Sequence, residues 1–591
     1  MIQQNNVFHR LEDFLKSNFS SENNISLILR DKNISNKEIA LINFSLQKCH
    51  EIKTLNLSLI NGNISGDKIV ILFNNLHILN NLSSLVLNFN LNQINKQDLN
   101  VIGQQLQKCS NISTLKLFLT ENNIKKEGFS ELTKAFKKLN NIQNFELELG
   151  LNGIKLEEAK IIAEGLSQLN TVNRFKVWLH QNQLQSDGAA VIFEALSEFQ
   201  NLTNLELNLF QNDIGDLAFS NLKTILSKCN KLVALDLVLS DNIIGDVGAS
   251  AIGESLKFCQ NLQSLELYLH QNQIEDEGAI GLGQGIGFLQ NVTKFIIFLY
   301  RNQIGDKGAI AIGEGLSRCS NLTDLDINLF YNHIKDNGAS SIGQGLSKCS
   351  MLSTLKLVLS ENEISDVGAT AIGLGLSQCQ SLINLFIYLQ DQDEDISKIG
   401  SEYSKCIKLN VLTLHFSTNK IDDEGIIPFS QWLKNCKDLK KLNIYLYENQ
   451  IGDDGAISIG AGLSFCQQLT DLEIILWSNQ INDIGVKALR EGLEKCINLQ
   501  VLKLNLIYND VSSDEEQKIG IVISKLPYLL TLKSVFCKEE KYFKSLELLN
   551  CKNIKALVIN SSFCSTNTQI ISHKRLSLKI RRLVKLQAIL S

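Results

Sequence analysis

The chain has 591 residues, a formal net charge of −5 at pH 7 and a hydrophobic content of 44%. A chain of this length exceeds the size at which one compact core keeps growing, so it forms several domains or a repeat array. The balanced charge disfavours a nucleic-acid-binding protein, and the absence of any run of about 18 apolar residues disfavours a membrane span.

The first 48 residues are predicted to form an N-terminal cap. Phe8, Leu11, Phe14 and Leu15 give the segment an amphipathic start, and a partial repeat follows around residues 25–29. The segment lacks the basic region and apolar core of a secretory signal. Terminal repeats of a solenoid typically depart from the consensus in this way.

A repeat of about 30 residues occupies residues 49–526. Its sixteen copies start at residues 49, 79, 109, 139, 169, 199, 229, 259, 289, 319, 349, 379, 406, 436, 466 and 496. Self-similarity at a fixed period is the sequence signature of a solenoid or another repeat architecture.

Each copy combines two hydrophobic periods, as the copy Cys319–Lys348 illustrates. Leu325, Ile327 and Leu329 alternate with polar residues, which predicts a strand with one buried face. A helix is predicted next, because apolar residues then follow one helical stripe: this stripe contains Ala339, Ile342, Leu346 and Cys349.

Three further residue types serve the backbone. Asp336 is predicted to be the N-cap of its own helix. Asn332 is predicted to satisfy the backbone of successive turns with its amide. Gly343 and Gly345 each cost about 1 kcal/mol in a helix, so their recurrence predicts a close approach of neighbouring helices.

Stacked copies are predicted to curve. Strands stack at about 4.8 Å and helices at about 8–10 Å, so the strands must line the inner side. The fold class predicted is α/β, a horseshoe solenoid with an inner parallel β-sheet and outer helices.

The pattern LxxLxLxLxxNxIxDxGAxxIGxGLxxC in residues 322–349 resembles the leucine-rich repeat of the ribonuclease-inhibitor type. The resemblance covers the sixteen repeats of about 30 residues, and it implies a non-enzymatic protein-interaction scaffold or sensor without a cofactor. This chain has one more apolar strand position than the family, which predicts a longer strand. The repeat array also resembles that of the Ran GTPase activators, which use a catalytic Arg from an early repeat. Arg30 is the candidate for that alternative function.

Eleven of the 14 cysteines occupy one repeat position, which Leu or Phe fills in the other copies. Such a position is an apolar packing site. The cysteines are therefore predicted to be reduced, which indicates a cytoplasmic protein. The eight His residues are scattered, with no spacing suited to zinc.

The copy at residues 379–405 is irregular, and its loop is acidic. Asp391, Asp393, Asp395 and Glu402 match four positions of a calcium loop, but Ile396 stands where the sharp turn requires Gly. We therefore interpret residues 391–395 as a solvated acidic bulge.

Residues 527–591 are predicted to hold degenerate repeats and a basic C-terminal cap. The tail at residues 571–591 is basic and amphipathic and contains no acidic residue. This pattern favours a segment that seals the last repeat. A helix that contacts a membrane surface or calmodulin is the alternative.

The candidate binding site is the concave face, at the strand positions that point away from the helices and at the strand ends. Aromatic side chains are enriched at protein interfaces, whereas β-propensity alone accounts less well for those at the strand ends. The candidates are Trp178, Phe210, Tyr268, Phe298, Tyr300, Phe330, Tyr331, Phe386, Tyr388, Tyr445, Tyr447, Trp477 and Tyr508, together with Asp326. Twelve acidic and five basic residues share these positions, which predicts a protein partner with a basic face and disfavours nucleic acid.

Overall fold

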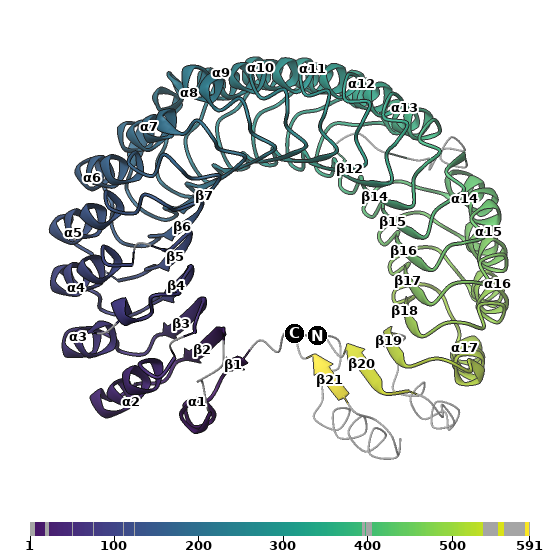
Figure 1. Ribbon diagram of the computed structural model, residues 1–591. Coiled ribbons are helices and arrows are strands. Elements are labelled where there is room, and N and C mark those ends of the chain that lie inside the picture. The colour runs from purple at the N-terminus through teal and green to yellow at the C-terminus, as the bar shows by residue number, and fades with distance from the viewer. Residues whose placement is uncertain are drawn as a thin grey trace. The chain divides into compact units, whose positions relative to one another are not determined.

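The computed structural model describes residues 6–17, 23–49, 51–74, 76–109, 111–122, 124–392, 396, 405–535, 554–560 and 585–589. The chain divides into two compact units, residues 1–292 and 293–591. Each unit is a stack of strand–helix repeats (Figure 1).

In the first unit, each strand pairs in parallel with the next one along the chain. The strands are β1 (Asn6–Phe8), β2 (Asn24–Arg30), β3 (Thr54–Ile60), β4 (Ser84–Asn88), β5 (Thr114–Phe118), β6 (Asn144–Glu148), β7 (Arg174–Trp178), β8 (Asn204–Asn208), β9 (Ala234–Val238) and β10 (Ser264–Tyr268). The helices are α1 (Leu11–Lys16), α2 (Asn36–Leu46), α3 (Asp67–Phe73), α4 (Lys96–Leu106), α5 (Lys126–Phe136), α6 (Leu156–Leu166), α7 (Gln185–Ala195), α8 (Leu222–Lys228), α9 (Asp246–Leu256) and α10 (Asp276–Ile286). Short 3₁₀ helices lie at Leu76–Ile78, Leu196–Glu198 and Asp216–Phe219.

The second unit repeats this parallel order. Its strands are β11 (Lys294–Phe298), β12 (Asp324–Asn328), β13 (Thr354–Val358), β14 (Asn384–Tyr388), β15 (Val411–His415), β16 (Lys441–Tyr445), β17 (Asp471–Ile475), β18 (Val501–Asn505), β19 (Thr531–Val535), β20 (Ala556–Asn560) and β21 (Lys585–Ile589). Its helices are α11 (Asp306–Leu316), α12 (Asp336–Leu346), α13 (Asp366–Leu376), α14 (Asp423–Asn435), α15 (Asp453–Leu463), α16 (Asp483–Leu493) and α17 (Ser513–Lys525).

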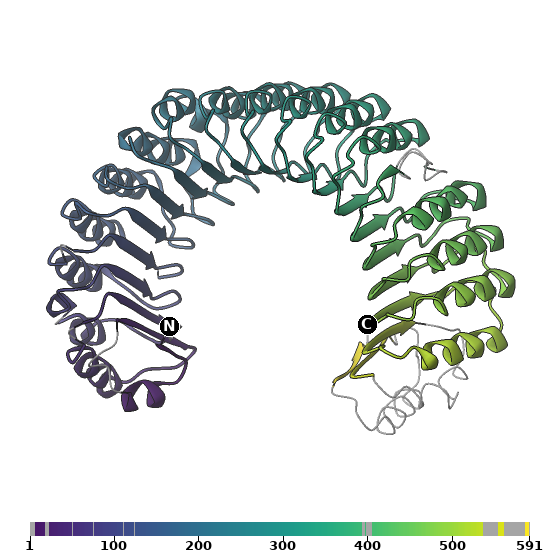
Figure 2. The same ribbon diagram turned by 45° about the vertical axis from the view of Figure 1, so that its right-hand side comes forward.

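Within each unit the strands lie on the inner side and the helices on the outer side (Figure 2). The core fills the space between these two layers. Leu325, Ile327 and Leu329 are buried on one side of it, and Ile342 and Leu346 are buried on the other. The predicted α/β solenoid is confirmed within both units. Most strands are only five residues long, and the extra apolar residue, such as Leu329, follows the strand. The N–H of Leu329 nevertheless donates to the carbonyl of Val358 in the next repeat at 2.8 Å, so backbone pairing continues to this residue.

A ladder of buried Asn side chains connects successive turns, as predicted. The amide nitrogen of Asn332 donates to the carbonyl oxygens of Leu299 and Leu329, at 3.1 and 3.0 Å. Its Oδ1 accepts from the backbone N–H of Ile304 at 3.0 Å. Gln392 replaces Asn in the irregular copy and still donates to the carbonyl of the preceding repeat. The ladder thus satisfies buried backbone groups that would otherwise lack partners.

The predicted N-cap role of Asp336 was wrong. Lys335 occupies the N-cap position, and Asp336 begins the helix. The carboxylate of Asp336 instead accepts from the backbone N–H groups of Ser365 and Gly368, both at 2.9 Å, at the start of the next helix. Asp306 and Asp453 make the same contacts one repeat ahead. Each of these carboxylates therefore caps its neighbour's helix.

The helix glycines permit close helix packing, as predicted. A Cβ atom on Gly375 would overlap the carbonyl oxygen of Gly343 in the neighbouring helix, and one on Gly345 would overlap that of Gly313. The backbones of α11, α12 and α13 therefore approach each other where these glycines lie.

The eleven cysteines at the repeat position are free thiols buried in the core. Burial raises the pKa of the Cys319 thiol to about 12 and that of Cys349 to about 11. The thiols act as apolar packing groups, as predicted for this position.

The irregular copy keeps the strands in register. Asn384 of β14 pairs with Val411 of β15, 27 residues later, whereas Val411 pairs with Lys441, 30 residues later. Residues 393–395 and Glu402, which completed the proposed acidic loop, lie outside the described residues. Most of the tail at 571–591 also lies outside them, and its described part, β21, is a strand paired with β20.

Candidate functional site

The parallel register arranges the inner-face side chains in rows that run across the strands. Asp326 pairs with Lys356, and Asn328 pairs with Val358. We call the residues equivalent to Asp326 the first row, those equivalent to Asn328 the second row and those equivalent to Phe330 the third row. Residues equivalent to Tyr331, which follow the third row, form the rim.

The rim residues share a left-handed backbone conformation. Tyr331 has φ of 56° and Tyr508 has φ of 55°, values that are uncommon for residues other than Gly. The N–H of Tyr331 donates to the carbonyl of Ser360 in the next repeat at 3.0 Å, which fixes the turn. Both tyrosines are exposed, at 57% and 47%. They therefore lie at the edge of the inner face and not on the sheet itself.

A first aromatic cluster in the second unit contains Phe298, Tyr300, Phe330 and Tyr331. Consecutive ring centroids in this order are 6.3, 6.5 and 6.1 Å apart. The ammonium group of Lys356 lies 5.7 Å from the Phe298 ring centroid and forms an ion pair with Asp326 at 3.3 Å. The carboxylate of Asp326 is therefore paired within the protein, beside this cluster.

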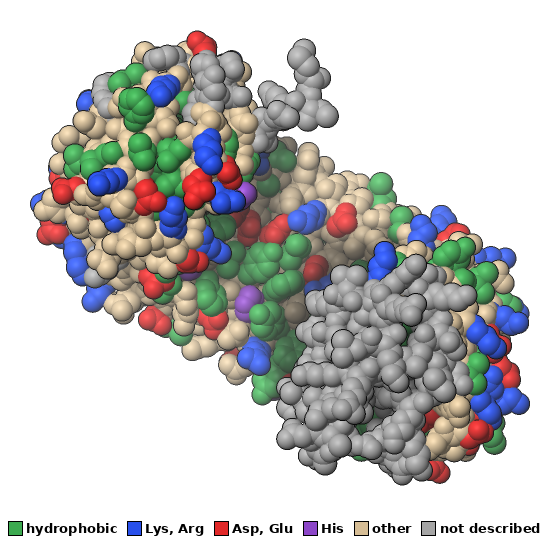
Figure 3. All heavy atoms as spheres, turned by 90° about the horizontal axis from the view of Figure 1, so that it is seen from below, with side chains coloured by type: hydrophobic (Ala, Val, Ile, Leu, Met, Phe, Trp, Pro, Cys, Tyr) green, Lys and Arg blue, Asp and Glu red, His purple; other side chains and the backbone are tan. Residues whose placement is uncertain are grey.

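A second aromatic cluster spans β14 to β18 and contains Tyr388, His415, Tyr445, Tyr447, Trp477 and Tyr508. The His415 ring centroid lies 5.8, 4.8 and 5.8 Å from those of Tyr388, Tyr445 and Tyr447. Tyr447 and Trp477 stack at 4.9 Å with 9° between their planes, and Trp477 contacts Tyr508 at 6.5 Å. The cluster is therefore a continuous series of rings across five strands. Figure 3 shows hydrophobic side chains gathered near acidic and His side chains on the inner surface.

Burial and carboxylates together shape the electrostatics of the second cluster. The pKa of the Tyr447 hydroxyl is raised by burial and then by Asp391 and Glu448. The pKa of Tyr445 is likewise raised by burial and then by Glu473. Burial lowers the pKa of His415 to about 4, so this ring is neutral at physiological pH.

Three carboxylates occupy the rim beside the second cluster: Glu361, Asp391 and Glu448. Among the ion pairs of the described residues, none involves these three groups. In contrast, Glu473 in the first row pairs with Lys503. The rim of this part of the second unit therefore carries uncompensated negative charge.

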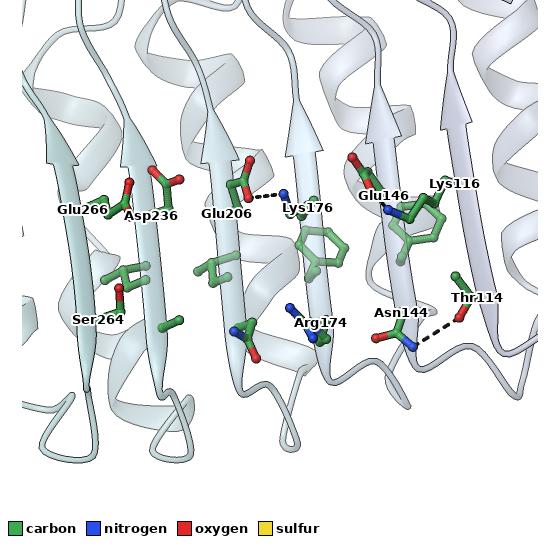
Figure 4. Close-up of a pocket in the computed structure, with 16 residues that line it drawn as sticks. Thr114, Lys116, Asn144, Glu146, Arg174, Lys176, Glu206, Asp236, Ser264 and Glu266 are labelled. Carbon is green, nitrogen blue, oxygen red and sulfur yellow. Dashed lines mark hydrogen bonds and ion pairs between the residues drawn. The ribbon is translucent and has the colours of Figure 1, made fainter. Parts of the chain in front are cut away.

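The first unit has a groove of about 560 Å³ on its inner face (Figure 4). The first four residues of its first row alternate in charge, and neighbouring side chains pair: Lys116 with Glu146 at 2.7 Å, and Lys176 with Glu206. Asp236 and Glu266 continue this row. Arg174 also lines the groove, two residues before Lys176 on β7. The groove thus carries charged groups of both signs over a partly apolar floor, unlike the aromatic clusters of the second unit.

Three predicted site residues lie in the first unit, separate from the aromatic clusters. The indole N–H of Trp178 donates to Glu206 at 2.8 Å. The hydroxyl of Tyr268 donates to Glu266 at 2.8 Å. Phe210 lies half-buried in the third row. Trp178 and Tyr268 thus each bond to a carboxylate of the first row.

The remaining predicted residue, Phe386, lies in the first row of the second unit between Lys356 and Thr413. Two residues of interest were absent from the prediction. His415 lies at the centre of the second cluster, and Phe118 occupies the second row of the first unit. Both stand at the same repeat offset as Tyr388 and Tyr445, so the offset itself was the signal that could have identified them.

Other site types find no support among the described residues. Within them, no group of three or more His, Cys, Asp or Glu residues is arranged to hold a metal ion. No helix in the described part of the chain has the length and apolar character needed to cross a membrane. Arg30, the candidate for the GTPase-activating alternative, lies exposed at the end of β2.

The family model described as Leucine Rich repeat matches residues 228–253, 258–283, 299–313, 318–343, 352–373 and 408–430. Among solved structures, the chain is similar to a leucine-rich repeat protein of Leptospira interrogans, with 19% identity, 90% of this chain and 99% of that chain covered, and a TM-score of 0.49. It is also similar to an internalin of Listeria monocytogenes, with 20% identity, 79% and 88% coverage, and a TM-score of 0.38. No curated protein matches the chain.

Proposed function

We propose that this leucine-rich repeat protein is a non-enzymatic scaffold or sensor that binds a protein partner on the concave face of its second unit. The observation that carries the proposal is the continuous second aromatic cluster, from Tyr388 on β14 to Tyr508 after β18. Leucine-rich repeat proteins are generally protein-interaction scaffolds, and curved solenoids offer extended concave surfaces for binding.

The composition of the cluster supports binding over a purely structural role. Tyr and Trp supply large contact areas at low conformational cost, and they are enriched among residues that dominate binding energy. Tyr445, Tyr447 and Trp477 remain partly accessible although the rings pack together. The rings are held in place before a partner arrives, which reduces the entropy lost on binding.

The partner we propose has a basic face. The rim carboxylates Glu361, Asp391 and Glu448 form no ion pair among the described residues. A partner with basic side chains would be attracted by this charge and correctly oriented. Nucleic acid would be repelled, since its phosphates are also negative.

A reducing compartment, such as the cytoplasm, belongs to the same proposal. The eleven buried thiols are free and pack in the core. Reducing conditions would keep such thiols in this form.

A capture experiment tests the binding proposal. The wild-type chain and a Tyr445→Ala/Tyr447→Ala/Trp477→Ala variant are used as baits in lysate, and bound proteins are identified by mass spectrometry. Phe465→Ala is the matched control, because Phe465 is an aromatic residue, 46% exposed, at the end of an outer helix. We expect the triple variant to lose partners that the Phe465 variant retains. Identical partner sets for all three proteins would contradict the proposal, provided that circular dichroism shows each to be folded.

A further inference from the structure

We propose that the second aromatic cluster and its acidic rim bind an extended, arginine-bearing segment of the partner, which lies across the strands. The inference rests on the proposed function, because the same face receives the partner. It adds the chemistry of the bound segment and the position of its cation.

The dimensions of the cluster fit a short extended segment. The cluster covers the five strands β14 to β18, which at about 4.8 Å per strand give a length of about 19 Å. An extended chain rises about 3.3 Å per residue, so about six residues cover this distance. Each of β15, β16 and β17 already pairs on both sides. The segment must therefore be recognised by side chains and not by addition of a strand.

The ring geometry directs a cation to the rim. The rings of Tyr447 and Trp477 are stacked at 4.9 Å, which leaves no space for a third group between them. The partner's groups can therefore contact the edges and outward faces of these rings but cannot insert between them. The carboxylates of Asp391 and Glu448 lie on the side of the cluster where the strands end, and both raise the pKa of the Tyr447 hydroxyl.

The rim arranges its carboxylates as neighbours. Three successive rim residues each donate a backbone N–H to a backbone carbonyl of the following repeat. The bonds join Asp391 to Ser417 at 3.3 Å, Thr418 to Tyr447 at 2.9 Å and Glu448 to Trp477 at 3.0 Å. The hydroxyl of Thr418, which stands between the two carboxylates along the rim, donates to Glu448 at 3.4 Å. At about 4.8 Å per strand, Asp391 and Glu448 are about 10 Å apart at the backbone. Because each side chain can extend toward the other, one cation between them can contact both carboxylates.

Arginine suits this position better than lysine. Its planar guanidinium carries five N–H donors in a fixed fork and packs well against aromatic groups. A lysine ammonium is a compact, strongly hydrated charge, which loses more hydration on binding. The rim offers two carboxylates and one hydroxyl beside an aromatic surface, which matches the donors of a guanidinium.

The test uses the full chain and three fluorescein-labelled six-residue peptides. These are Arg-Gly-Arg-Gly-Arg-Gly and its counterparts with lysine or with citrulline, which is a neutral isostere of arginine. Binding is measured by fluorescence anisotropy at low salt. We expect the arginine peptide to bind about tenfold more tightly than the lysine peptide, as for the loss of one charge-assisted hydrogen bond, and the citrulline peptide not to bind measurably.

Two pairs of substitutions locate the site. Asp391→Asn/Glu448→Gln should weaken binding of the arginine peptide about tenfold or more. Glu424→Gln/Asp454→Asn removes the same charge from exposed positions on the outer helices α14 and α15, and it should leave the affinity unchanged. Equal effects of the two double variants would show general charge attraction and would overturn the inference.

The outcomes separate this inference from the proposed function. If the ring variant loses its lysate partner but Asp391→Asn/Glu448→Gln retains both partner and peptide, the face binds protein and the arginine inference is wrong. Equal affinity for the arginine and citrulline peptides would likewise overturn it, by favouring apolar or sugar-like recognition. If the ring variant keeps every lysate partner, the proposed function itself fails.

Discussion

The carboxylate of Asp336 accepts a hydrogen bond of 2.9 Å from the backbone N–H of Gly368, which lies 32 residues later in the chain. The first turn of α13 thus obtains part of its cap from the preceding repeat. Four N–H groups at a helix start lack partners within the helix. This contact therefore adds to the local cap of α13, in which the hydroxyl of Ser365 accepts from the N–H of Val367 at 3.2 Å. It also couples two neighbouring repeats through one charged side chain.

Asp336→Ala should lower the free energy of unfolding by about 1–2 kcal/mol, the range for loss of an N-cap. The cause is the loss of the acceptor for the N–H groups of Ser365 and Gly368. Urea denaturation followed by circular dichroism measures the change. Asn337→Ala, at the next and exposed position of the same helix, is the control and should have a much smaller effect. Equal effects of the two substitutions would show that the contact between repeats is not important.

Gly375→Ala should destabilise the second unit more than Gly462→Ala, although both glycines occupy the same repeat position. A Cβ on Gly375 would lie 1.9 Å from the backbone oxygen of Gly343, whereas one on Gly462 would meet a side-chain atom of Leu433 at 3.0 Å and the Cα of Ser430 at 3.1 Å. Contacts near 3 Å can be relieved by shifts of a few tenths of an ångström, whereas an overlap of this size with a helix backbone requires the two helices to move apart. Thermal melting compares the two variants, and a melting temperature lowered equally in both would contradict this explanation.

The eleven repeat-position cysteines should not react with Ellman's reagent in the folded chain at pH 8. They are buried, and burial raises the pKa of thiols such as Cys496 and Cys466 to about 12. The thiolate, which is the reactive form, is therefore scarce as well as inaccessible. Cys537, Cys551 and Cys564 lie outside the described residues. We expect no more than three thiols to react before denaturant is added and all 14 afterwards; rapid reaction of more than three would contradict the burial.

Stability should fall as the pH decreases from about 6.5 to about 4, partly through His415. Its ordinary pKa is about 6.5, but in the folded chain burial lowers it to about 4. Between these values the unfolded chain binds a proton that the folded chain does not, so acid favours unfolding. His415→Asn should make the loss of stability with acid smaller.

Thermal midpoints at pH 7, 6, 5 and 4 measure this dependence. His270, whose pKa is also lowered to about 4 by burial, should preserve part of the dependence in the His415 variant. His9→Asn, at an exposed position, is the control. If the decrease of the thermal midpoint between pH 7 and pH 4 is the same in His415→Asn as in the wild type, His415 does not contribute to the pH dependence of stability.

The alternation of helix and strand could be predicted from the sequence because both periods are visible in the regular repeats, such as residues 319–348. Asn332 could also be assigned, since a buried amide in a repeated turn has only neighbouring backbone groups to bind. The role of Asp336 could not be assigned, because an acidic residue at a helix start usually indicates the N-cap of its own helix. Only the placement of the next repeat shows that its Oδ1 faces Ser365 and Gly368 instead.

The sequence predicts where the aromatic residues lie on the inner face, but it does not predict which of their rings contact each other. Repeat offsets placed Tyr447 and Trp477 at neighbouring strand ends, yet their stacking at 9° depends on side-chain rotations that the sequence does not specify. His415 differs from the other rings of the cluster because His in a sequence first indicates a metal ligand, whereas here it packs against Tyr445 as a ring. Trp178 shares an offset with Tyr445, but its neighbours Glu206 and Lys176 make its surroundings polar.

The dependence of α12 and α13 on the aspartate of the previous repeat has a consequence for how such a chain can change length. A duplication or deletion of one complete 30-residue copy within α11 to α13 would leave every remaining helix with an upstream aspartate at the correct distance. An insertion of a few residues between Asp336 and Gly368 would separate a donor from its acceptor. Selection would therefore tolerate gain and loss of whole copies more readily than small changes inside one. Arrays of this kind can consequently evolve new lengths, and new concave surfaces, in steps of one repeat.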